Sequence, residues 1–86
     1  MNEPYQVLLT RPAEKDIRRL PKSDRQRAQE AILALAEAPR PRGCQKLVQG
    51  EGYRIRVGIY RITYGIDDDA REVTVYRVLH RRDAYR

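Results

Sequence analysis

The chain has 86 residues, 41% of them hydrophobic, which predicts one small folded domain over residues 1–86 and excludes a disordered tail. Its 18 Lys and Arg residues outnumber its 12 Asp and Glu residues, and the net charge of +6 favours a polyanionic partner, either nucleic acid or an acidic protein. A single Cys excludes an internal disulfide, and one Cys with one His excludes a His/Cys zinc cluster. No segment resembles a signal peptide or a membrane span, so we expect a cytoplasmic protein.

The N-terminal part predicts a strand followed by a helix. The apolar run "YQVLL" at residues 5–9 has the length of a strand. Thr10 and Pro12 then have the character of a helix start. Acidic residues follow in the first turn, namely Glu14 and Asp16. The apolar stripe of this helix consists of Ala13, Ile17 and Leu20. Pro21 ends the helix, because the residue before a proline is pushed out of the helical region.

A second helix is predicted after Pro21. The segment "SDRQ" matches a capping box, with Ser23 as the cap and Gln26 three residues later. The buried face of this helix is expected to contain Ala28, Ala31, Ile32, Leu35 and Ala36. The segment "APRPRG" at residues 38–43 ends it. The two antiparallel helices form a hairpin that can cover one side of a sheet.

The C-terminal half predicts strands. Residues 53–57, 60–66 and 72–79 form strands linked by short turns, and "CQKLVQ" at residues 44–49 holds a further short strand. Short links make the three longer strands an antiparallel meander. The chain is therefore predicted to have an α+β fold, in which a small antiparallel β-sheet packs against an N-terminal helical hairpin.

The stretch "YRIRVGIYRITYG" sets the register of the first two strands of the meander. A two-residue turn at Gly58 and Ile59 is expected, because Gly at the first central position suits a type II′ turn. Directly opposed residues then share a face. The face under the helices would carry Tyr53, Ile55, Val57, Tyr60, Ile62 and Tyr64. The other face would carry Arg54, Arg56, Arg61 and Thr63. A one-residue slip would exchange the two faces.

In this register Arg56 lies directly opposite Arg61. Like charges opposed across strands destabilise a sheet, and a bound anion reduces the repulsion. The planar fork of arginine forms two parallel charge-assisted bonds to phosphate oxygens. The patch is therefore expected to hold a phosphate, and the alternative is a solvated sheet face with scattered charges.

The C-terminal segment "RVLHRRDAYR" leaves two alternatives open for the last strand. Val73 and Val75 share one face, whereas Val78 has the opposite parity, so a β-bulge would re-aim the rest of the strand. Without a bulge, Tyr76, Val78 and His80 share a face. Either way, the end of this strand gathers His80, Arg81, Arg82 and Tyr85. Among these cations His80 is expected to be neutral and able to act as a base.

The segments "YRIRVGIYRITYGI" and "VLHRRDAYR" closely resemble the RelE side of the RelE/ParE toxin superfamily, and the earlier "RPAEKDIRRLPK" and "PRPRG…KL" fit the same pattern. The resemblance extends from Tyr5 to Tyr85. It implies the toxin of a type II toxin–antitoxin pair, an endoribonuclease that needs neither metal nor cofactor and cuts mRNA in the ribosomal A site. It also implies mRNA, the ribosome and a cognate antitoxin as partners, the last in a hetero-oligomer.

The resemblance implies site residues on the hairpin. Arg54 and Arg56 match basic positions of the first catalytic strand, and Arg61 matches the arginine after the turn. Some RelE proteins carry lysine where this chain has Arg54 and Arg56, and lysine loses a proton more readily than arginine. This difference leaves the identity of the general base open.

Further implied site residues lie near the C-terminus. Arg81 and Tyr85 match the arginine and tyrosine of the C-terminal motif, and some relatives have a histidine near His80. In the implied reaction the RNA 2′-hydroxyl attacks the adjacent phosphate and forms a 2′,3′-cyclic phosphate. Arg61 and Arg81 would hold the phosphate oxygens. Tyr85 would stack on a base or orient the nucleotide, and His80 would take part in proton transfer.

Two other functions stay open. ParE proteins share the fold and poison DNA gyrase without cutting RNA, although they generally lack the full catalytic set. A plain nucleic-acid-binding module without toxicity is the third hypothesis. For either toxin, an antitoxin would neutralise the chain by covering its arginines or by displacing residues 80–86.

Overall fold

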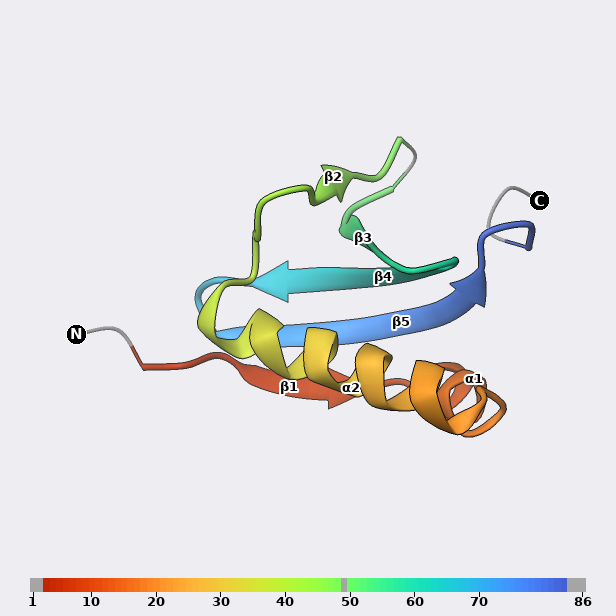
Figure 1. Ribbon diagram of the computed structural model, residues 1–86. Coiled ribbons are helices and arrows are strands. Elements are labelled where there is room, and N and C mark those ends of the chain that lie inside the picture. Colours follow the sequence, from red (N-terminus) through yellow and green to blue (C-terminus); the bar gives the residue numbers. More distant parts are fainter. Residues whose placement is uncertain (1–2, 49, 84–86) are drawn as a thin grey trace.

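The computed structural model describes residues 3–48 and 50–83, which form one strand, two helices and then four more strands (Figure 1). The elements are β1 (Gln6–Leu9), α1 (Arg11–Arg18), α2 (Lys22–Glu37), β2 (Gln45–Lys46), β3 (Tyr53–Val57), β4 (Tyr60–Asp67) and β5 (Glu72–His80). The predicted α+β fold, a small sheet packed against an N-terminal helical hairpin, is confirmed. No helix among the described residues is long and apolar enough to cross a membrane.

The strands form one five-stranded sheet in the order β1-β5-β4-β3-β2. The predicted meander of β3, β4 and β5 is antiparallel, and β2 adds to its edge in the same sense. The partner of β1 was not predicted: β1 pairs in parallel with β5, with Gln6 opposite Glu72. A parallel pair requires a long connection, and here both helices and the rest of the sheet lie between the two strands in the chain.

The start of α1 agrees with the prediction, whereas the start of α2 does not. Thr10 caps α1, and its side chain accepts a hydrogen bond of 3.1 Å from the amide of Ala13. The predicted Ser23 capping box is wrong, because Ser23 lies inside α2, which begins at Lys22 without a side-chain cap. Pro21 occupies the cap position, and its carbonyl already accepts the amide of Arg25 at 2.8 Å.

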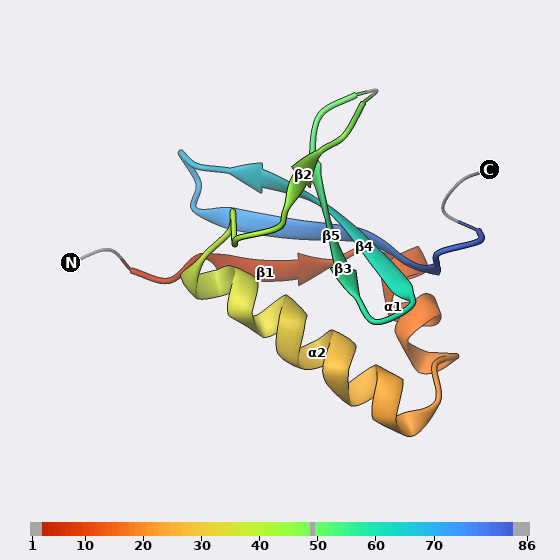
Figure 2. The same ribbon diagram turned by 45° about the horizontal axis from the view of Figure 1, so that its top comes forward.

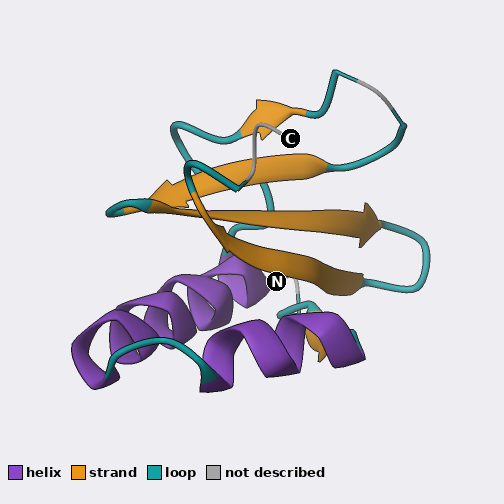
Figure 3. Cartoon of the chain, turned by 90° about the vertical axis from the view of Figure 1, so that its right-hand side faces the viewer, coloured by secondary structure: helices purple, strands orange, loops and turns teal. Residues whose placement is uncertain are grey.

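Both helices lie on one side of the sheet (Figure 3). The apolar core lies between these two layers and consists of Ala13, Ile17, Leu20, Ala28, Ile32, Leu35, Ile62, Tyr64, Val73, Val75 and Val78. Tyr64 is fully buried, and its hydroxyl donates a 2.8 Å hydrogen bond to the carbonyl of Pro39. This bond satisfies the polar tip of a large ring in the centre of the core. We call the side of the sheet under the helices the covered face and the other side the open face.

The hairpin of β3 and β4 has the predicted turn and register. Gly58 has a φ of 61°, a conformation that favours glycine. Val57 pairs with Tyr60 and Arg56 with Arg61, as the two-residue turn requires. The hairpin tip approaches the helices (Figure 2), where the Tyr60 hydroxyl donates a 3.2 Å hydrogen bond to Asp24.

A β-bulge in β5 decides between the two alternatives for the last strand. Thr63 lies opposite Arg77 and Tyr64 opposite Val75, so Tyr76 is the extra residue. The bulge returns Val78 to the covered face, where it is buried with the other valines of β5.

Asp16 has a different role from the predicted first-turn acid. It is 8% exposed, and its two oxygens accept hydrogen bonds of 2.8 and 3.0 Å from the guanidinium of Arg77. The amide of Val78 donates a further bond of 3.0 Å. Burial alone would raise the pKa of Asp16, but the Arg77 and Val78 hydrogen bonds and the positive charges of Arg77 and Arg19 lower it below its usual value. This contact joins α1 to β5.

Candidate functional site

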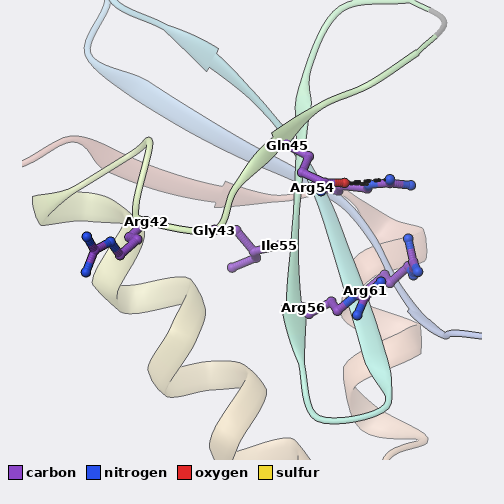
Figure 4. Close-up of a pocket in the computed structure, with 7 residues that line it drawn as sticks. All are labelled: Arg42, Gly43, Gln45, Arg54, Ile55, Arg56 and Arg61. Atoms are coloured by element: carbon purple, nitrogen blue, oxygen red, sulfur yellow. Dashed lines mark hydrogen bonds between the residues drawn. The ribbon is translucent and has the colours of Figure 1, made fainter.

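The open face carries the arginines that the sequence placed there. Arg54 and Arg56 come from β3 and Arg61 comes from β4. Figure 4 shows their side chains on the same side of the hairpin, while Ile55 points to the opposite side. The alternation of side chains along a strand explains the arrangement, because the neighbours of core residues in the chain point away from the core.

Arg54 is held in place by a residue that the sequence did not single out. The side-chain oxygen of Gln45 accepts hydrogen bonds of 3.1 and 2.6 Å from two nitrogens of the Arg54 guanidinium (Figure 4). Gln45 belongs to β2 and lies opposite Arg54 in the sheet. Because the amide is neutral, it fixes the orientation of the guanidinium without cancelling its charge.

Arg61 is the most enclosed member of the group, with only 4% of its surface exposed. Burial is the main cause that lowers its pKa, followed by repulsion from Arg54, Arg56 and Arg81. The fold thus places a largely buried cation near three other arginines, whose positive charges repel it.

Arg81 joins this group from the end of β5. Its amide donates a 2.7 Å hydrogen bond to the carbonyl of Ile59, in the turn of the hairpin. The bond ties the chain after β5 to the hairpin tip. We call Arg54, Arg56, Arg61 and Arg81 together the arginine cluster.

Two hollows meet at the arginine cluster. The edge hollow, about 380 Å³, is lined by Arg42, Gly43, Gln45, Arg54, Ile55, Arg56 and Arg61. The tip hollow, about 170 Å³, is lined by Arg56, Gly58, Tyr60, Arg61 and Arg81. Arg56 and Arg61 line both hollows, so they lie at the junction. Arg42 was not predicted as a site residue, and its side chain points away from the other arginines (Figure 4).

His80 lies on the covered face, away from Arg54, Arg56 and Arg61, and its predicted role in proton transfer stays a prediction. It lies opposite Tyr60 in the sheet, and the two rings meet edge to face with centroids 5.8 Å apart. The bulge at Tyr76 is the reason, because it places His80 on the same face as Val78. The Nδ1 atom of His80 accepts a 3.3 Å hydrogen bond from the amide of Arg82. The mechanism proposed below therefore does not depend on His80.

The predicted site residue Tyr85 lies outside the described residues, so its role stays a prediction. Within residues 3–48 and 50–83, no group of three or more His, Cys, Asp and Glu side chains is arranged to hold a metal ion. Among the described residues that line the two hollows there is neither a carboxylate nor an imidazole. Among the described lining residues the charged groups are guanidiniums, beside the phenol of Tyr60 and the amide of Gln45.

Comparison with known proteins identifies the family. A model of the ParE toxin of the type II toxin–antitoxin system parDE matches residues 7–85. The chain belongs to the RelE/ParE toxin superfamily. It is thus the toxin of a type II toxin–antitoxin system, and the predicted family is confirmed. No curated protein is significantly similar to this toxin in sequence.

Solved structures of toxin–antitoxin complexes resemble the toxin over most of its length. The RelBE2 complex of Mycobacterium tuberculosis shares 32% identity, covering 91% of this chain and 99% of that chain, with a TM-score of 0.81. The archaeal RelE–RelB complex of Pyrococcus horikoshii OT3 shares 26% identity over 91% and 96% of the two chains, with a TM-score of 0.82. The RelB–RelE complex of Methanococcus jannaschii shares 29% identity over 92% and 95%, with a TM-score of 0.74.

Proposed function

We propose that residues 1–86 form one toxin domain that acts in the cytoplasm as a metal-independent endoribonuclease and cuts mRNA in the ribosomal A site. The observation that carries the proposal is the burial of Arg61 among the other arginines of the cluster. A phosphate that gains negative charge during the reaction would offset this repulsion most strongly at its transition state. Interactions of this kind, stronger in the transition state than in the ground state, accelerate a reaction.

The proposed reaction is an internal transfer at phosphorus. The RNA 2′-oxygen bonds to the adjacent phosphorus and the bond to the 5′-oxygen breaks, leaving a 2′,3′-cyclic phosphate and a 5′-hydroxyl. One proton leaves the 2′-hydroxyl and one reaches the 5′-oxygen. Arg61 and Arg81, which both line the tip hollow, hold the phosphate oxygens. Arg54 or Arg56 stabilises the charge that develops at the 2′-oxygen.

The lowered pKa of Arg61 adds to this role. Burial and the positive charges of Arg54, Arg56 and Arg81 lower this pKa, and an oxygen that gains negative charge would offset the same causes. Gln45 keeps Arg54 oriented before RNA binds, which reduces the entropy lost when the complex forms.

The composition of the site supports dependence on the ribosome. The two hollows are small, and the described residues that line them include no carboxylate or imidazole to move protons. Electrostatic stabilisation works only when the nucleotide is held in a reactive geometry. A ribosome that holds the mRNA in its A site would supply that geometry.

Primer extension of cellular mRNA after induction tests this proposal. Wild-type toxin is expected to produce new 5′ ends, and Arg61→Ala to produce few or none. Arg18→Ala is a matched control, because Arg18 lies on α1 with 72% of its side chain exposed. New 5′ ends of equal intensity from Arg61→Ala would remove Arg61 from the site.

A second candidate is inhibition of DNA gyrase without RNA cleavage. It is supported by the family model itself, which describes a ParE toxin. This function predicts DNA damage with intact mRNA after induction. The same induced cultures therefore separate the two candidates.

We further propose a cognate antitoxin as the partner, in a hetero-oligomer with the toxin. The similarity to RelB–RelE complexes and the basic open face support this. An acidic antitoxin segment would either cover the arginine cluster or displace residues 80–86. Covering makes association slower as salt rises. Displacement is tested by the NMR order of Arg81 to Asp83, which it predicts to fall on binding.

A further inference from the structure

The bulge residue Tyr76 places an aromatic ring on the open face. A Cβ atom built on Gly65 would lie 2.1 Å from the Tyr76 hydroxyl oxygen and 2.9 Å from the ring carbon that bears it. A Cβ atom built on Gly52 would lie 3.5 Å from another ring carbon. The ring therefore lies across the bare backbone of two glycines, and 38% of Tyr76 stays exposed.

In this position the Tyr76 ring contributes little to packing of the apolar core. The core lies on the covered face, whereas the tyrosine lies on the open face with Thr74 and Gly65. An aromatic ring that rests on backbone and turns its other side to solvent is a surface on which a planar group can stack.

Tyr76 is separated from the arginine cluster by one cross-strand pair, Thr63 and Arg77. Tyr76 is inserted between Val75, opposite Tyr64, and Arg77, opposite Thr63. Thr63 in turn lies opposite Arg54. Gly52, beneath the ring, precedes Arg54 by two residues, about 7 Å along an extended chain. This is a distance that one nucleotide spans.

We propose that Tyr76 is a positioning residue that stacks on the nucleobase next to the phosphate held by the arginine cluster. The proposal rests on the proposed function, since it assigns a place to one base of the same RNA. Stacking accepts every base and favours the larger surface of a purine. Tyr76 is thus expected to give a mild preference for a purine at one position beside the cut.

Negative charges on the side of Tyr76 away from the arginine cluster decide which part of a nucleotide can contact the ring. The hollow on that side of Tyr76 is also lined by Glu51, Asp67, Asp68 and Asp69. Asp68 is paired with Arg40 at 2.9 Å, and the remaining carboxylates repel phosphates. A base can lie on the ring while its phosphates stay on the arginine side, so the RNA contact ends at Tyr76 in that direction.

Substitutions at the ring test the proposal with mRNA-programmed ribosomes. Tyr76→Leu should raise KM about 10-fold, flatten the nucleotide preference beside the cut and change kcat little. Tyr76→Phe keeps the ring and should behave as wild type. Gly65→Ala, which displaces the ring, should act in the same direction as Tyr76→Leu and add nothing to it in the double variant. Equal KM and nucleotide preference for Tyr76→Leu, Tyr76→Phe and wild type would overturn the proposal.

A binding measurement separates this inference from the proposed function. The probe is an mRNA bound to programmed ribosomes, with 2-aminopurine at each A-site position in turn and a 2′-deoxy nucleotide at the cut, which blocks cleavage. Fluorescence should be quenched at one position by wild type and Tyr76→Phe and not by Tyr76→Leu. Quenching that depends on Tyr76 in a toxin that cuts no RNA keeps the stacking site and rejects the nuclease. Cleavage by wild type with no such quenching rejects the stacking site alone.

Discussion

The two faces of the sheet are formed by the same strands, but burial of side chains stabilises the fold on one face and opposes folding on the other. On β4, Ile62 and Tyr64 are fully buried on the covered face, and the neighbouring Arg61 on the open face is only 4% exposed. Burial of Ile62 and Tyr64 removes apolar surface from water and stabilises the fold. Burial of Arg61 removes a cation from water and places it among others, which opposes folding.

This difference shows how the site is positioned. Side chains alternate along a strand, so the register that packs Ile62 against the helices also fixes Arg61 opposite Arg56. The covered face supplies the stability, and the open face holds an arrangement that the fold does not require. A conflict of this kind is expected where a site is prepared for a ligand.

The largest expected effect comes from the open face. Arg61→Ala should lower the rate of mRNA cleavage about 100-fold to 1,000-fold, because it removes one donor to the charged phosphate. Single-turnover cleavage on programmed ribosomes measures it. Arg81→Ala should act in the same direction, since both residues line the tip hollow. If Arg61→Ala cut as fast as Arg18→Ala, the catalytic role of the cluster would be lost.

The next effect comes from the ion pair that joins α1 to β5. Asp16→Asn should lower the free energy of unfolding by about 2 kcal/mol, because the ion pair with Arg77 breaks and leaves a half-exposed guanidinium. Urea denaturation measures the loss. Glu14→Gln is the matched control: its ion pair with Arg18 is long, at 3.8 Å, and exposed, so little change is expected. Equal stabilities of the two variants would contradict the structural role of Asp16.

Asp16 also predicts how stability depends on pH. Its pKa in the fold lies below the ordinary value of 3.8, so in that range the unfolded chain binds more protons than the folded one. The stabilisation from Asp16 is complete above about pH 4 and disappears as pH falls through the lower, folded value. Denaturation curves from pH 6 to pH 2 should show a smaller loss for Asp16→Asn than for wild type. Parallel losses in both proteins would assign the acid sensitivity to other carboxylates.

Local patterns were enough to predict one part of the site. Gly58 fixes a two-residue turn, and the alternation from Tyr53 to Tyr64 then assigns every residue of the hairpin to a face. The position of the three hairpin arginines follows directly. Arg81 was predicted as a site residue from the C-terminal motif. In the structure, its backbone hydrogen bond to Ile59 holds it beside the hairpin arginines.

The rest depended on contacts between distant parts of the chain. The bulge at Tyr76 exists because Val78 must reach the core, and it moves His80 to the covered face. Asp16 and Arg77 are 61 residues apart, and no periodicity relates them. Gln45 reaches Arg54 through a strand of only two residues, which is too short to carry a pattern of its own.

The smallest expected effect gives the sharpest contrast between the two faces. Arg56→Met removes a charge from the open face, where Arg56 is exposed and lies opposite Arg61. Loss of a directly opposed like charge should leave the free energy of unfolding unchanged or raise it by about 0.5 kcal/mol, the opposite sign to Asp16→Asn. Inorganic phosphate should raise the Tm of wild type more than that of Arg56→Met, because the anion relieves the same repulsion. Thermal melts at constant ionic strength, with chloride replaced by phosphate, measure both quantities. A clear loss of stability in Arg56→Met, with an equal response to phosphate, would mean that the opposed arginines do not repel each other in the folded toxin.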